Sequence, residues 1–204
     1  MSNIQVNNSV MTMLLTEIEK VVARSQKMPV IIAIDGNCGS GKTFYSSKLS
    51  TCLGASVIHC DDFFLPTELR SAERLNEVGG NIHYERLHDT LAMLKAEPFT
   101  ANNTNQTFTY SAYNCSTATF EEITQAKSNI IIVEGSYALH KMLRNFYDLK
   151  ILFKIDSLTQ YQRLLQREGE QGISNFVNRW IPLENRYFDS LDTTGCVIVD
   201  TSEI

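Results

Sequence analysis

The chain has 204 residues with 18 Lys and Arg against 23 Asp and Glu, and 43% of its residues are hydrophobic. This describes one globular domain over residues 1–204 and excludes disordered, collagen-like and disulfide-built chains. The formal net charge of -5 argues against a protein that coats nucleic-acid polymers. We expect no membrane segment and no secretion signal, because no apolar run is long enough. Five cysteines without a CxxC pair predict a reducing, cytoplasmic setting.

Hydrophobic periodicity predicts the main elements. Apolar residues recur every three or four positions over residues 9–26, which indicates an amphipathic helix. Residues 30–34 form a continuous β-branched run, typical of a strand buried on both faces. Further strands are predicted over residues 55–60, 129–134, 149–155 and 196–199, and helices over residues 42–53, 84–96, 158–167 and 173–180. This alternation predicts a three-layer α/β fold with a parallel central sheet and helices on both faces.

Residues 98–119 break this alternation, because they are rich in Asn, Thr, Ser and Tyr. The pattern favours a β-hairpin that leaves the main sheet.

A glycine-rich loop follows the first predicted strand and fits GxxxxGK[ST] at every fixed position. Its residues are Gly36, Asn37, Cys38, Gly39, Ser40, Gly41, Lys42 and Thr43. In such a loop, backbone N–H groups surround a nucleotide polyphosphate, here ATP or GTP. We expect Lys42 to contact the β- and γ-phosphates and the Thr43 hydroxyl to bind Mg²⁺. The motif and its place between strand and helix therefore predict a P-loop NTPase fold.

Acidic residues end two of the predicted strands. Asp61 and Asp62 follow the second strand, where a carboxylate can accept a proton from an attacking hydroxyl. Successive side chains leave a strand on opposite sides, so only one of the pair is expected to face the phosphates. Glu134 ends an apolar strand, at the position where P-loop proteins carry an acidic group that orders Mg²⁺. The alternatives are a helix cap for the aspartates and a solvated strand end for Glu134.

Arginines gather in a predicted lid over residues 163–186. Arg163 and Arg167 are four residues apart on one helix face, and the polar segment 168–172 that follows is suited to a hinge. Such arginines can neutralise charge that develops during phosphoryl transfer. A solvated helix face with ion pairs is the alternative.

The ordered set of motifs resembles the uridine kinase group of P-loop small-molecule kinases, which includes pantothenate kinase and phosphoribulokinase. The correspondence spans roughly residues 29–200 and includes Asp61-Asp62-Phe63-Phe64, where the family has Asp-Ser-Phe-Tyr. The resemblance implies that Asp61 is the general base, that Glu134 and Asp61 help organise Mg²⁺, and that Lys42, Arg163 and Arg167 stabilise the transferred phosphate. It implies an acceptor-side insertion over residues 61–120. There it places the substrate-binding candidates Asp62, Phe64, His83, Tyr84 and Tyr113.

The departures from the family pattern lie on the acceptor side. His83 stands where nucleoside kinases carry an Asp that binds the ribose diol, and Cys115 follows Tyr113-Asn114 where the family has an aromatic residue. We therefore predict an ATP-dependent, Mg²⁺-requiring kinase that phosphorylates a hydroxyl of a small molecule, with a uridine- or cytidine-like nucleoside as first candidate. A pantothenate- or sugar-like acceptor and a non-catalytic nucleotide-binding regulator are the alternatives. Kinases of the resembled family are often oligomers, so the resemblance also implies a possible homo-oligomer.

Overall fold

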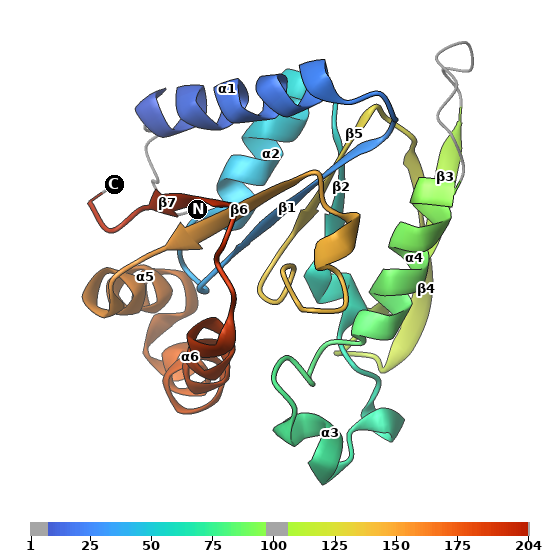
Figure 1. The fold of residues 1–204 in the computed structure, drawn as a ribbon. Helices are drawn as coiled ribbons and strands as arrows, with labels where there is room; N and C mark the ends of the chain where they lie inside the picture. Colours follow the sequence, from blue (N-terminus) through green and yellow to red (C-terminus); the bar gives the residue numbers. More distant parts are fainter. Residues whose placement is uncertain (1–7, 97–105, 204) are drawn as a thin grey trace.

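A single five-stranded parallel sheet forms the centre of the molecule (Figure 1). The computed structural model of the chain describes residues 8–96 and 106–203. The strand order is β2-β5-β1-β6-β7, and all four pairings are parallel. The strands are β1 (Val30–Gly36), β2 (Ser56–His59), β5 (Ile130–Glu134), β6 (Leu149–Lys154) and β7 (Cys196–Asp200). Strand β1 is central because its apolar side chains are buried on both faces.

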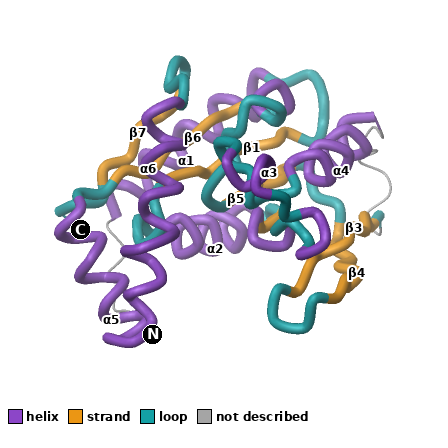
Figure 2. Tube along the Cα trace, turned by 90° about the horizontal axis from the view of Figure 1, so that it is seen from below, coloured by secondary structure: helices purple, strands orange, loops and turns teal. Residues whose placement is uncertain are grey.

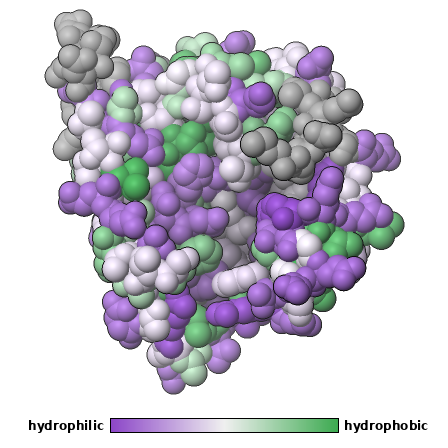
Figure 3. All heavy atoms as spheres, turned by 180° about the vertical axis from the view of Figure 1, so that it is seen from behind, coloured by the Kyte–Doolittle hydropathy of each residue, from purple (hydrophilic) through white to green (hydrophobic). Residues whose placement is uncertain are grey.

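Each face of the sheet is covered by its own layer, which confirms the predicted three-layer architecture. Helices α1 (Asn8–Arg24) and α2 (Lys42–Leu53) cover one face, where Leu14 packs with Ile32. Helix α4 (Tyr84–Ala96) covers the other face, where Leu91 packs with Ile31. Because successive residues of β1 point to opposite faces, one strand supplies both hydrophobic cores. On the outer face shown in Figure 3, hydrophilic residues dominate and the hydrophobic ones form small, separate patches.

The predicted hairpin is present and extends beyond its predicted end. Strands β3 (Thr107–Asn114) and β4 (Thr119–Ala126) pair antiparallel in a separate two-stranded sheet. The first part of the predicted segment, residues 97–105, lies outside the described residues. Strand β4 was not predicted, because its side chains are mostly exposed and carry little apolar periodicity. In Figure 2 the hairpin and helix α5 lie on opposite sides of the molecule, with α2 between them.

Nearly continuous helical elements span the predicted lid, residues 163–186. Helix α5 (Ser157–Asn175) contains a non-helical residue, Gly169, with φ 71°. A π-helical turn (Phe176–Trp180) then leads into α6 (Ile181–Ser190). The sequence predicts two separate helices here, over residues 158–167 and 173–180, and the non-helical Gly169 does divide α5 into two helical pieces. The second piece differs from the prediction because it continues through the π-helical turn into α6. The kink falls inside the predicted hinge, because Gly169 tolerates a positive φ.

Short elements complete the chain between the major ones. They are α3 (Ala72–Asn76) and the 3₁₀ turns Cys60–Phe63, Thr67–Leu69 and Arg144–Phe146.

Candidate active site

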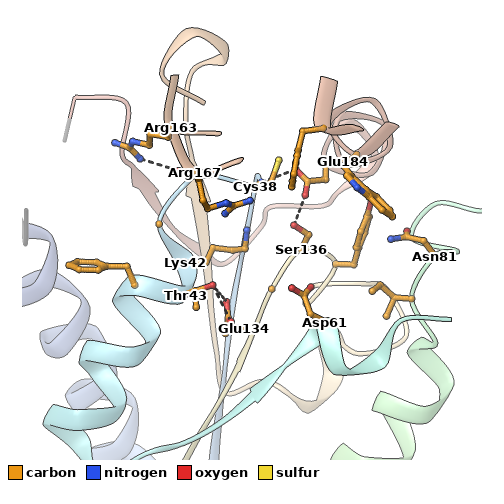
Figure 4. Close-up of a pocket in the computed structure, with 18 of the residues that line it drawn as sticks. Cys38, Lys42, Thr43, Asp61, Asn81, Glu134, Ser136, Arg163, Arg167 and Glu184 are labelled. Atoms are coloured by element: carbon orange, nitrogen blue, oxygen red, sulfur yellow. Dashed lines mark hydrogen bonds between the residues drawn. The ribbon is translucent and has the colours of Figure 1, made fainter. Parts of the chain in front are cut away.

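A cavity of about 900 Å³ opens at the carboxyl ends of the parallel strands (Figure 4). Its walls come from the glycine-rich loop, the segments at the ends of β2 and β5, and the helices α5 and α6. The carboxyl edge of a parallel sheet is where α/β proteins place their ligands. The structure therefore brings together segments that are widely separated in the sequence.

The glycine-rich loop has a backbone shape that requires its glycines. Gly36 has φ 149°, and a Cβ added there would lie 2.3 Å from the carbonyl oxygen of Phe153. Gly39 and Gly41 also have positive φ, and α2 begins directly after them at Lys42. The start of α2 thus points its free N–H groups into the loop, the arrangement that binds phosphate. Of the predicted loop residues, Cys38, Gly39, Gly41, Lys42 and Thr43 line the cavity.

The side chain of Lys42 folds back along the inside of the glycine-rich loop. Its ammonium group donates hydrogen bonds to the carbonyl oxygens of Gly36 at 2.6 Å and Asn37 at 3.0 Å. These contacts hold a largely buried positive charge at the cavity wall. The Lys42 ammonium group is thus already positioned to contact a phosphate that enters the loop.

Thr43 and Glu134 form the candidate metal site. The Thr43 hydroxyl lies 3.3 Å from both carboxylate oxygens of Glu134, which is only 4% exposed. On the other side of Glu134, Nδ1 of His59 lies 2.6 Å from Oε1. Hydroxyl and carboxylate oxygens are ligands that Mg²⁺ prefers, and Mg²⁺ usually takes its remaining ligands from phosphate and water. The residues present therefore fit the ion.

Asp61 and its neighbour Asp62 point in different directions, although both lie in the 3₁₀ turn Cys60–Phe63 and not in the strand from which the expectation was argued. Asp61 lines the cavity (Figure 4). Enclosure by the cavity walls raises the pKa of Asp61 above its usual value, and the nearby Glu134 raises it further, while Lys42 opposes both. Asp62 does not line the cavity, and its Oδ2 accepts a hydrogen bond of 2.7 Å from the Tyr110 hydroxyl of the hairpin. Asp61 is thus the carboxylate of the pair that faces the cavity, and Asp62 holds the hairpin through Tyr110.

Both lid arginines line the cavity on the loop side. Arg163 donates to the carbonyl oxygens of Gly39 at 3.2 Å and Thr201 at 2.7 Å. Arg167 pairs with the neighbouring Glu168 at 2.6 Å. The arrangement places two guanidinium groups beside the loop where phosphate charge would develop.

Two acidic residues near the cavity were not predicted from the sequence. Glu184 of α6 is 5% exposed, accepts the Cys38 backbone N–H at 2.8 Å and accepts the Ser136 hydroxyl at 2.6 Å. The only sequence signal is an acidic residue inside the aromatic, apolar segment 180–188, a pattern more typical of packing than of a site.

Asp35 is the second of these acids and is fully buried beneath the loop. It accepts hydrogen bonds from the backbone of Gly36 and Leu139 and from the Tyr187 hydroxyl. Burial raises the pKa of Asp35 to about 6. In the sequence, Asp35 directly follows the strand predicted over residues 30–34, but no motif distinguishes it as a site residue.

Of the five predicted substrate-binding residues, one lines the cavity and four do not. Phe64 lines the cavity and its ring centroid lies 6.1 Å from that of Trp180. The other candidates lie outside the cavity lining: Asp62 as above, His83 against Glu85, Tyr84 stacked on His140, and Tyr113 with its hydroxyl accepting from the Thr67 backbone. A direct role for these four in binding an acceptor stays a prediction that this geometry does not support.

The sequence is similar to two curated proteins, and no family model matches it. It is 22% identical to uridine-cytidine kinase C of Dictyostelium discoideum over 158 residues, which is 76% of this chain and 34% of that protein. It is 27% identical to inorganic pyrophosphatase TTM2 of Arabidopsis thaliana over 148 residues, which is 70% of this chain and 21% of that protein. The chain thus spans about a third and about a fifth of the lengths of these relatives.

Solved structures share the fold over nearly the whole chain. A possible uridine kinase from Bacillus stearothermophilus has a TM-score of 0.68 at 22% identity, covering 95% of this chain and 98% of its own. D-glycerate 3-kinase from Cryptococcus neoformans has a TM-score of 0.63 at 17% identity, covering 95% and 94%. The chain therefore has the fold of the P-loop small-molecule kinases. Together with the sequence similarity, this confirms the predicted resemblance to the uridine kinase group.

Proposed function

We propose that this protein is an ATP-dependent kinase that transfers the γ-phosphate to a hydroxyl group of a small metabolite, most specifically the 5′-hydroxyl of uridine or cytidine. One observation carries the proposal. The loop lysine Lys42, the oxygen pair Thr43–Glu134 and the carboxylate of Asp61 all face one cavity, although they come from three separate elements. Phosphoryl transfer needs these three parts: a phosphate cradle, a cation site and a proton acceptor.

The residues have distinct tasks in the proposed reaction. The acceptor oxygen attacks the γ-phosphorus, the bond to the β-phosphate bridging oxygen breaks, and ADP leaves. Asp61 takes the proton that the acceptor hydroxyl loses. Lys42, Arg163 and Arg167 stabilise the charge that spreads over the transferred group. Mg²⁺, held by Thr43 and ordered by Glu134, would neutralise charge on the β- and γ-phosphates.

The nucleoside acceptor is supported by the name of the Dictyostelium relative and of the Bacillus structure. The glycerate kinase fold supports a non-nucleoside acceptor equally at the level of architecture, and the displacement of His83 from the cavity removes one family contact. For these reasons a panel of nucleoside and non-nucleoside compounds is needed to identify the acceptor. Five free cysteines support the proposed cytoplasmic setting. No helix in the described part of the chain is long and apolar enough to cross a membrane. The homo-oligomer stays a prediction.

The decisive experiment measures ADP release from Mg²⁺-ATP and from Mg²⁺-GTP across uridine, cytidine, pantothenate, glycerate and simple sugars. The blank is Lys42→Ala, which removes the loop charge. We expect uridine or cytidine to stimulate release above the blank. Stimulation by another acceptor alone would overturn the nucleoside assignment and keep the kinase. Tight ATP binding with no stimulation by any acceptor would overturn the kinase and favour a nucleotide-binding regulator.

A further inference from the structure

The cavity has two chemically different halves. The loop and lid half carries its cations, Lys42, Arg163 and Arg167. The other half, here called the acceptor wall, is formed by Asp61, Phe64, Asn81, Tyr137, Trp180 and Glu184. Glu184 stands where the two halves meet, because it accepts the backbone N–H of the loop residue Cys38. Figure 4 shows Asp61, Asn81 and Glu184 on the side of the cavity away from Arg163. Among the residues that the structure describes, the acceptor wall includes two carboxylates and no Lys or Arg.

The cations of the other half are already engaged around the phosphate loop. Lys42 and Arg163 donate to loop carbonyl oxygens, and Arg167 pairs with Glu168. Bound nucleotide phosphates would draw these groups further toward the loop. A negative charge on the acceptor would therefore face the two carboxylates of the wall, while the guanidinium of Arg179 lies outside the cavity lining, over the Trp180 ring with 4.7 Å from Cζ to the ring centroid.

The Glu184 side chain cannot turn away from the cavity without losing two hydrogen bonds. Its two carboxylate oxygens are held by the Cys38 backbone N–H at 2.8 Å and by the Ser136 hydroxyl at 2.6 Å. The side chain is 5% exposed, and the next residues of α6 are fixed by the buried hydrogen bond from Tyr187 to Asp35. The negative charge of Glu184 is therefore a fixed feature of the wall.

The same wall offers two neutral polar groups. The amide nitrogen of Asn81 and the hydroxyl of Tyr137 are buried and interact with each other, and neither has a further hydrogen bond of normal geometry within the described chain. Buried polar atoms of folded proteins are nearly always fully paired, so these two groups retain hydrogen-bonding capacity for a polar ligand. The neighbouring rings of Phe64 and Trp180 add an apolar surface.

We propose that Glu184 is a specificity-determining residue that restricts the acceptor to molecules without a negative charge. An acceptor hydroxyl or amide can donate to the wall carboxylates and pair with Asn81 and Tyr137, whereas a carboxylate is repelled by Glu184. This inference rests on the proposed function, because it assigns the wall to the phosphate acceptor. Selection by a repulsive charge is a common route to specificity.

The test compares acids with their uncharged amides, which have nearly the same shape. The pairs are D-glycerate with D-glyceramide, pantothenate with its primary amide, and 5-carboxyuridine with 5-carbamoyluridine. Calorimetry measures the affinity of each compound for the protein saturated with Mg²⁺-ADP, so that no phosphate transfer is required. We expect at least one amide to bind, and to bind about tenfold or more tightly than its acid.

The variant Glu184→Gln removes the charge and keeps an oxygen for the Cys38 N–H. It should shrink the preference for the amide severalfold, mainly by improved binding of the acid. The matched control is Glu170→Gln, a change of an exposed lid glutamate outside the cavity lining, which should leave the preference unchanged. A merely structural role of Glu184 would weaken both members of a pair equally.

The outcomes separate this inference from the proposed function. Binding of amides over acids without any ADP-forming turnover would contradict the kinase and keep the selective wall. Equal or tighter binding of the acids to the wild type would overturn the inference, even if turnover is observed. Failure of every compound to bind, or an unchanged preference in Glu184→Gln, would also overturn it.

Discussion

The hydroxyl of Thr43 lies 3.3 Å from both carboxylate oxygens of Glu134, although 91 positions separate the two residues in the sequence. Parallel pairing of β1 with β5 causes this approach. The register aligns Ile34 with Glu134, so the end of β5 lies beside the start of the loop that leads to Thr43. Main-sheet topology, rather than local sequence, therefore assembles the candidate metal site.

The first prediction concerns this pair. Thr43→Val removes the hydroxyl and keeps the side-chain shape, so the Mg²⁺ concentration for half-maximal ADP formation should rise by about tenfold or more. Magnesium titration of the purified variant measures this directly. The control is Thr51→Val on the same helix, whose exposed hydroxyl bonds only the Ser47 carbonyl oxygen. An unchanged magnesium requirement in Thr43→Val would remove Thr43 from the metal site.

A second prediction tests the proton acceptor. Asp61→Asn should lower the turnover number by roughly 10²- to 10⁴-fold, because the acceptor hydroxyl loses its base. The dissociation constant for Mg²⁺-ATP should change little, which a fluorescent nucleotide titration can measure. Asp62→Asn is the matched control, since it alters the hydrogen bond to Tyr110 outside the cavity lining. If both variants retained turnover within a few-fold of wild type, Asp61 would not be the base.

The pH dependence of turnover follows from the same residue. The pKa of Asp61 is raised above its usual value, first by enclosure in the protein and then by Glu134. Asp61 can accept a proton only when ionised, so activity should decline as the pH falls through this raised pKa. The pH–rate profile of wild type should thus show an acidic limb at a higher pH than an ordinary aspartate gives. Its absence from the residual activity of Asp61→Asn would assign the limb to Asp61.

Sequence patterns were sufficient for the parts of the molecule that depend on local chemistry. The β-branched run at residues 30–34, the helix at 42–53 and the loop between them could be predicted because burial periodicity and glycine-rich spacing are local signals. The sequence also predicted that only one of Asp61 and Asp62 faces the phosphates, and only Asp61 lines the cavity. The reason given was the alternation of side chains at a strand end, whereas both residues lie in a 3₁₀ turn.

Other parts depend on contacts that only the fold creates. Glu184 reaches Cys38 across 146 positions, and nothing near it in the sequence distinguishes it from a packing residue. His83 aligns with a family acceptor residue, but its side chain is drawn to the neighbouring Glu85 and to the Arg86 backbone. Strand β4 is stabilised by pairing with β3 rather than by burial, so its sequence lacks a clear pattern.

A fourth prediction concerns the backbone of the loop. Gly36→Ala should destabilise the protein by at least about 2 kcal/mol, because its Cβ would collide with the Phe153 carbonyl in the centre of the sheet. Gly54→Ala is a matched control, since Gly54 also has positive φ but has open space around the added Cβ. It should cost only about 1 kcal/mol from backbone strain. Urea unfolding of both variants compares the two effects, and equal losses would contradict the steric explanation.

The last prediction concerns the buried carboxyl group of Asp35, which lies under the loop and accepts the Tyr187 hydroxyl at 2.7 Å. Burial raises its pKa from 3.8 to about 6. The folded protein therefore holds this proton more tightly than the unfolded chain does. The free energy of unfolding that comes from this group is highest below about pH 4, decreases as the pH rises to about 6, and is constant above that. A shift of this size corresponds to about 3 kcal/mol.

Asp35→Asn should abolish this component, although it also leaves part of the hydrogen-bond set unpaired at every pH. The measurement is the difference in unfolding free energy between wild type and variant in urea, taken from pH 4 to pH 7.5 so that other titrating groups cancel. We expect the wild-type advantage to be largest at the acidic end. Tyr187→Phe removes a hydrogen bond that lowers the pKa of Asp35, so it should move the same transition to higher pH. A wild-type advantage that stays constant across the range would contradict the raised pKa of Asp35.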